Sequence, residues 1–140
     1  SPTVVLDCAH NVASVRNMTS EVRKNINFDR CFVILGLMKD KEIDNIIEIL
    51  SQFGDLFFLV QVNPERGETT GKLKEKLNKY NKPVQVSESV SDALQAAKKF
   101  AKPKDLVCVT GSFYTVAEAK KCFQHEKNLA NPGSAPHPRK

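Results

Sequence analysis

The sequence predicts an α/β fold in which a mostly parallel sheet of five or six strands carries helices on both faces, a three-layer sandwich. Two observations carry this prediction. Short apolar runs alternate with longer stretches whose apolar residues recur every three or four positions. The short runs are mostly continuous, as in parallel strands that are buried on both faces. The length of 140 residues suits one domain with a single core.

Five short runs rich in β-branched and other apolar residues are the predicted strands. They lie at residues 3–7, 30–36, 56–60, 84–86 and 105–110. Five stretches with helical spacing separate or follow them. The residues that mark their apolar faces are Val12, Val15, Met18, Val22 and Ile26; Ile43, Ile46, Ile47 and Leu50; Leu73, Leu77 and Tyr80; Val90, Leu94, Ala97 and Ala101; and Val116, Ala119 and Phe123.

The apolar pattern stops after the last of these stretches. We therefore expect a domain over residues 1–123 and a flexible tail over 124–140, where three prolines and a glycine interrupt a segment with little to bury. His125 and His137 belong to this tail. His10 is then the one histidine that is a good candidate for a functional site.

Composition and charge argue against several classes of partner. The net charge is +5, and the lysines between residues 72 and 82 have a single aromatic residue, Tyr80, among them, which is too few for a surface on which bases could stack. No run approaches the roughly 18 apolar residues that a membrane-spanning helix needs. The start of the sequence lacks the basic and apolar regions of a signal peptide, and no two of the four cysteines have C-x-x-C spacing. We expect a cytoplasmic protein with no nucleic-acid or membrane partner.

Polar residues follow four of the predicted strands at the points where they end. Asp7 ends the first strand and His10 follows it, Asp40 and Lys41 follow the second, and Ser112 follows the fifth. The segment 63–67, which includes Arg66, follows the third. In an open parallel sheet these positions share one edge, where ligands bind beyond the carboxyl ends of the strands.

Helix capping is an alternative interpretation of some of these residues. Asn11, and Ser112 or Thr115, are residue types that begin helices. Asp7 is harder to explain in this way, because a carboxylate directly after an apolar strand needs a partner. His10 could hold that carboxylate or share a bound ligand with it. No phosphate-binding loop of the G-x-x-x-x-G-K-[ST] or G-x-G-x-x-G type occurs, so we do not expect this chain alone to bind ATP tightly or hydrolyse it.

Three segments together resemble one enzyme family. They are V-V-L-D-C-A-H-N at 4–11, G-L-M-K-D-K-E-I at 36–43 and V-T-G-S-F-Y-T-V at 109–116. They are similar in order and spacing to the D-G-A-H-N, G-x-x-x-D-K-D and V-T-G-S-x-Y-x-V segments of folylpolyglutamate and dihydrofolate synthases, members of the Mur ligase superfamily. The resemblance spans the Rossmann-like C-terminal domain only, and the central ATPase domain has no counterpart here.

The resemblance implies a reaction. In this family ATP, with Mg²⁺, phosphorylates the carboxylate of a folate or dihydropteroate, and the amine of L-glutamate attacks the acyl phosphate. The C-terminal domain closes on the ATPase domain and has no catalytic residues in isolation, so this chain alone should be inactive and should hold no cofactor tightly. The alternatives are a non-catalytic binding or regulatory module, or another Mur-type ligase that adds an amino acid.

Residue roles also follow from the resemblance. It implies that ATP contacts Asp7 and His10, that glutamate contacts His10, Ser112, Tyr114 and Arg66, and that Asn11, Asp40 and Lys41 face the missing domain. The residues themselves leave simpler interpretations open. Tyr114 could pack in the core, Arg66 could be an exposed loop residue because Glu65 separates it from Asn-Pro, and Asp40 with Lys41 could be an exposed helix start.

Overall fold

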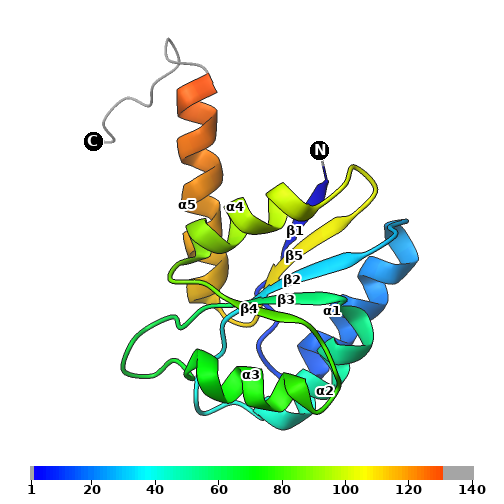
Figure 1. Ribbon diagram of the computed structural model, residues 1–140, viewed down its shortest axis with the longest axis vertical. Coiled ribbons are helices and arrows are strands. Elements are labelled where there is room, and N and C mark those ends of the chain that lie inside the picture. The colour runs from blue at the N-terminus through cyan, green and yellow to red at the C-terminus, as the bar shows by residue number, and fades with distance from the viewer. Residues whose placement is uncertain (1, 131–140) are drawn as a thin grey trace.

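The computed structural model describes residues 2–130, which fold into a five-stranded sheet with five helices (Figure 1). The strands are β1 (Thr3–Leu6), β2 (Cys31–Leu35), β3 (Leu56–Leu59), β4 (Val84–Val86) and β5 (Leu106–Thr110). The helices are α1 (Val12–Asn25), α2 (Ile43–Phe53), α3 (Thr70–Asn78), α4 (Val90–Phe100) and α5 (Phe113–Ala130).

The sheet has the order β1-β5-β2-β3-β4, and every neighbouring pair is parallel. The predicted α/β class and the largely parallel sheet are therefore confirmed. β5, the last strand in the chain, lies between β1 and β2. This insertion brings the segments that follow β1, β2 and β5 to adjacent positions at the carboxyl edge.

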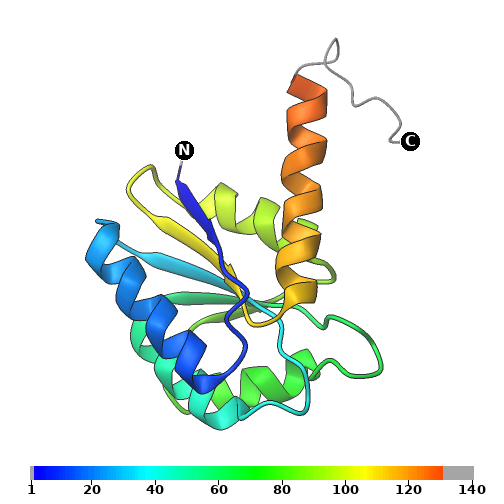
Figure 2. The ribbon, with the colours of Figure 1, turned by 180° about the vertical axis from the view of Figure 1, so that it is seen from behind.

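Helices cover both faces of the sheet. Alternate residues of each strand point to opposite faces, so that Val33 and Phe57 pack with α1, α2 and α3, whereas Ile34 and Phe58 pack with α4 and α5. Figure 1 shows α4 and α5 on one side of the sheet, and Figure 2, from behind, shows α1 on the other. The expected three-layer sandwich is present. Within residues 2–130 no helix combines the length and the apolarity that crossing a membrane requires.

Helix α5 is longer than the sequence pattern indicated. The expected tail begins at residue 124, but α5 continues to Ala130 and its end projects beyond the other elements (Figure 1). Contacts with α4 support this extension, because Lys98 lies 3.2 Å from Glu126 and 4.6 Å from the ring centre of Phe123. His125 is thus part of a helix. The rest of the expected tail, including His137, lies outside the described residues.

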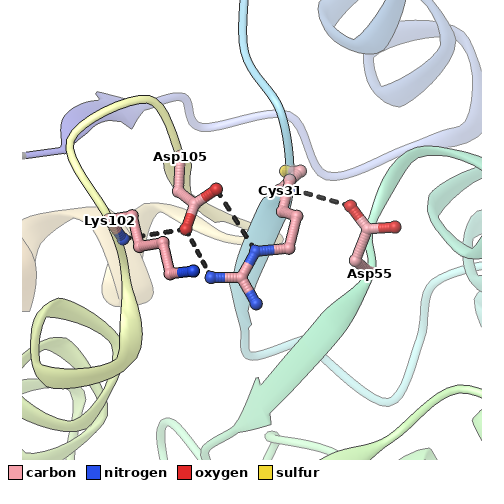
Figure 3. A network of polar contacts seen from close by, with 5 residues as sticks. Cys31, Asp55, Lys102 and Asp105 are labelled. Atoms are coloured by element: carbon pink, nitrogen blue, oxygen red, sulfur yellow. Dashed lines mark hydrogen bonds and ion pairs between the residues drawn. The ribbon is translucent and has the colours of Figure 1, made fainter.

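Charged side chains join the strands at their amino ends (Figure 3). Arg30, just before β2, donates two hydrogen bonds to Asp105, just before β5, at 2.7 and 3.3 Å. The same carboxylate accepts from the backbone N–H of Lys102 at 2.8 Å, and Asp55 accepts from that of Cys31 at 2.8 Å. The hydrogen bond from Arg30 lowers the pKa of Asp105, which is only 2% exposed.

Candidate functional site

A pocket of about 450 Å³ opens at the carboxyl edge of the sheet. Its walls come from the segments after β1, β2 and β3 and from the first residues of α5. The lining residues are His10, Met38, Lys39, Asp40, Lys41, Glu65, Arg66, Ser112, Phe113 and Tyr114. Most of the residues singled out in the sequence, from four separate segments, therefore meet at one place.

The segment after β1 places His10 in the lining of the pocket. His10 Nδ1 lies 2.9 Å from the carbonyl oxygen of Cys8, so this nitrogen carries a proton and Nε2 is left for a ligand. The imidazole also packs against Phe113, with ring centres 5.5 Å apart. Asp7 does not line the pocket. Its carboxylate accepts a hydrogen bond from the N–H of Ala9 at 2.9 Å, and this bond is the partner that a carboxylate at the end of an apolar strand needs.

Cys8, which stands where the resembling segment has glycine, does not narrow the pocket. Its half-buried side chain packs against the core on the α4 and α5 side of the sheet. Only its backbone carbonyl reaches toward the site, where it orients the His10 ring.

Ser112 is the N-terminal cap of α5 and is only 3% exposed. Its Oγ accepts the backbone N–H of Thr115 at 3.1 Å and lies 2.8 Å from Thr115 Oγ1. Thr115 Oγ1 donates to the carbonyl of Gly36 at 3.1 Å, so Ser112 must donate in the shared contact. The hydroxyl of Ser112 is thereby engaged within the domain, as the capping interpretation requires, and its role toward glutamate stays a prediction.

Two glycines allow the ends of β2 and β5 to meet at the pocket. Gly111 has φ of +113°, a conformation that L-residues rarely adopt, and a Cβ there would lie 2.3 Å from the carbonyl oxygen of Gly36. A Cβ on Gly36 would lie 2.8 Å from Thr115 Oγ1. This close approach makes the bond from Thr115 to Gly36 possible and fixes where α5 begins.

A tight turn after β3 directs Arg66 into the site. Asn63 has φ of +50°, and its backbone oxygen accepts from Arg66 and Gly67 at 3.1 and 2.7 Å. The carbonyl of Arg66 accepts the N–H of Lys39 at 2.8 Å, which ties this turn to the segment after β2. The guanidinium then reaches Tyr114, with Nη2 3.2 Å from Oη.

The structure decides between several of the open interpretations. Tyr114 is 46% exposed and lines the pocket, so core packing does not describe it. Arg66 is an exposed loop residue, but it faces the site despite the extra Glu65. Asp40 and Lys41 also line the pocket. Asn11 does not: it begins α1, where its side chain accepts the N–H of Ser14 at 2.8 Å.

Four lining residues were not among the site residues predicted from the sequence: Met38, Lys39, Glu65 and Phe113. Each lies within two residues of a predicted site residue in the same strand-end segment, so extending every segment by two residues would have included them. With them the lining carries three cationic side chains, two carboxylates and His10. The pocket thus has a formal excess of one positive charge, which suits a carboxylate or a phosphate.

Known proteins are similar to this chain in sequence and in fold. A family model described as "Mur ligase, glutamate ligase domain" matches residues 1–113. The dihydrofolate synthase/folylpolyglutamate synthase of Escherichia coli K12 is 32% identical over 128 residues, which are 91% of this chain and 29% of that protein. The enzyme of the same name from Haemophilus influenzae is 30% identical over 122 residues, 84% of this chain and 28% of that protein.

Solved structures give the same result. The E. coli FolC structure in complex with DHPP and ADP has a TM-score of 0.81 at 28% identity, and the match covers 89% of this chain and 29% of that one. A bifunctional folylpolyglutamate synthase/dihydrofolate synthase with Mn, AMPPNP and L-glutamate bound has a TM-score of 0.77 at 26% identity, covering 88% and 29%. This chain spans less than a third of the relatives that it matches. The chain belongs to the Mur ligase family, in which it corresponds to the glutamate ligase domain.

Proposed function

We propose that this domain forms the glutamate-binding wall of an ATP-dependent ligase that adds L-glutamate to folate or dihydropteroate. The observation that carries the proposal is the pocket in which His10, Arg66 and Tyr114 meet, at the edge of the sheet where ligands of such folds bind. A guanidinium forms bidentate hydrogen bonds with carboxylates. Related structures hold ADP, or Mn with AMPPNP and L-glutamate, which supports these ligand classes.

The proposal assigns roles according to position. Arg66 would bind a carboxylate of glutamate, with Tyr114 and Ser112 beside it. His10 would lie between glutamate and ATP, with Nε2 toward the ligands, and Asp7 would contact the nucleotide. The interface with the ATPase domain would include Asn11, Asp40 and Lys41, of which Asn11 and Asp40 are exposed.

In the proposed reaction the amine of glutamate attacks an acyl phosphate, forms an amide and releases phosphate. Acceleration requires that both reactants be held together in a pocket that excludes water. The chain described here supplies one wall of that pocket, so we expect it to be inactive alone. Within residues 2–130 no three His, Cys, Asp or Glu side chains gather as metal ligands. The described residues therefore do not fit a metal site by themselves, and we assign them no step through Mg²⁺.

The proposal is tested with a chimera, called the E. coli chimera, in which this domain replaces the matching segment of the E. coli K12 enzyme. Incorporation of labelled L-glutamate into dihydropteroate and into folate is measured. The control chimera carries the corresponding segment of the Haemophilus influenzae enzyme at the same junctions. We expect both chimeras to incorporate glutamate.

Two results would contradict the proposal. The first is an active control chimera beside an E. coli chimera that is folded by circular dichroism but incorporates no glutamate. The second is an E. coli chimera that prefers a different amino acid over glutamate, which would instead support another Mur-type ligase.

A further inference from the structure

We propose that Tyr114 is a positioning residue: its phenol oxygen holds the guanidinium of Arg66 in the orientation that receives the carboxylate of glutamate. This inference rests on the proposed function and assigns different roles to the two residues. Arg66 makes the contact with the substrate, and Tyr114 acts through Arg66.

The two side chains reach each other from separately anchored segments. Arg66 lies in the turn after β3, which is held by Asn63 and tied to Lys39. Tyr114 is the second residue of α5, whose start is fixed by the Ser112 cap. Strand β2 lies between β3 and β5 in the sheet, so the bond of 3.2 Å between Nη2 and Oη spans the pocket. Both backbones are fixed, and the remaining freedom belongs to the side chains.

Within the described part of the chain, no acidic side chain forms an ion pair with Arg66. The ion pairs among residues 2–130 join Arg30 to Asp105, Lys76 to Asp44, Lys98 to Glu126 and Lys121 to Glu118. None of them includes Arg66. Its guanidinium donates to a neutral phenol, that of Tyr114, which accepts one hydrogen bond and leaves four guanidinium N–H groups for a ligand.

A neutral partner suits an arginine that must bind an anion. An unrestrained arginine loses rotamer freedom when it binds, and a side chain that is already oriented loses less. A carboxylate partner would also orient the guanidinium, but it would compete with the carboxylate of the substrate. Tyrosine orients the group without that competition. The expected consequence is a contribution to glutamate affinity that disappears when Arg66 is absent.

The test is a double-mutant cycle in the E. coli chimera, with Tyr114→Phe, Arg66→Ala and the double variant. We expect Tyr114→Phe to raise the KM for glutamate about fivefold, because a hydrogen bond to a charged group is lost at an exposed position. The value of kcat should change less than about twofold, since the substituted group does not touch the reacting atoms. In the Arg66→Ala background the same substitution should leave the KM unchanged.

Tyr80→Phe is the matched control, because Tyr80 is 37% exposed and does not line the pocket. It should leave the KM and kcat at the values of the unmodified chimera. An equal effect of Tyr114→Phe with and without Arg66 would overturn the inference and would indicate a direct contact between Tyr114 and glutamate. An unchanged KM in the single variant would also overturn it. Failure of the proposed function differs from both, since the unmodified chimera would then not incorporate glutamate.

Discussion

The two ends of the sheet are built in different ways. At the amino ends of β2 and β5, charged side chains bind one another and backbone N–H groups, as Asp105 does with Arg30 and Lys102. At the carboxyl ends, glycines, a helix cap and a tight turn fix the backbone. There the charged side chains line a pocket, and the guanidinium of Arg66 donates to the phenol of Tyr114.

Because of this difference, the charged side chains at the amino ends contribute mainly to stability, and those at the carboxyl ends are left for ligand binding. A charged group that is paired within the domain stabilises the fold but has little left to offer a ligand. A charged group whose backbone is held by other means can keep its hydrogen bonds for a ligand. Substitutions of the backbone-fixing residues should therefore damage the carboxyl end, whereas the loss of charged side chains should damage mainly the amino end.

Gly111→Ala should have the largest effect. The new methyl group would meet the carbonyl oxygen of Gly36 at 2.3 Å, at a φ that disfavours alanine. We expect the free energy of unfolding to fall by about 3 kcal/mol or more. Gly71→Ala is the control, because no atom lies within 4 Å of a Cβ there and the position is helical. It should gain about 0.5 kcal/mol. Urea unfolding of both variants measures the contrast.

Asp105→Ala should have the next largest effect, because it removes hydrogen bonds at a buried position. We expect a loss of roughly 2–3 kcal/mol in the free energy of unfolding. Asp40→Ala, at the exposed carboxyl end, should change it by less than about 0.5 kcal/mol. If urea unfolding shows equal losses of unfolding free energy for Asp105→Ala and Asp40→Ala, the charged side chains at the two ends of the sheet do not differ in their contribution to stability.

The contribution of the Asp105 carboxylate should also appear in the pH dependence of the free energy of unfolding. The pKa of Asp105 is lowered in the folded state, so its contribution is complete above the ordinary value of 3.8 and is lost as the pH falls through the lower folded value. Comparison with Asp105→Asn isolates this contribution. The difference in unfolding free energy should be constant between about pH 7 and 5 and shrink below about pH 4. A difference that grows on acidification would contradict the assignment.

Ser112→Ala should have a smaller effect. It removes the cap of α5 and one partner of Thr115, for an expected loss of about 1 kcal/mol. Ser89→Ala removes the cap of α4, where Oγ accepts the N–H of Asp92 at 3.0 Å. Ser112 is the more buried of the two serines, so its substitution should cost more in thermal unfolding. A smaller loss for Ser112→Ala than for Ser89→Ala would mean that its hydroxyl is not committed to the cap.

The sequence was sufficient to predict the strands and the edge at which the site lies. Continuous apolar runs marked all five strands to within two residues, because burial on both faces leaves little choice of residue type. The capping role of Asn11 and Ser112 could also be predicted from the sequence, since short polar side chains are preferred at helix starts. Both signals are local and require no knowledge of which strands are neighbours.

The pairing of distant residues was not predictable in the same way. Arg30 and Asp105 are 75 positions apart and meet only because β5 lies next to β2. Arg66 and Tyr114 are 48 positions apart, and their contact depends on the turn that begins with Asn63 at positive φ. The final turns of α5 were missed because their support comes from α4 and not from an apolar stripe. Each of these features depends on tertiary geometry.

The KM for glutamate in the E. coli chimera tests most directly whether the carboxyl end of the sheet binds the substrate and the amino end does not. Arg66→Ala should raise the KM about tenfold or more while the free energy of unfolding stays within about 0.5 kcal/mol. Asp105→Ala, assayed below its unfolding temperature, should lower stability and leave the KM unchanged. A KM that rises with Asp105→Ala and not with Arg66→Ala would show that glutamate does not bind at the carboxyl edge.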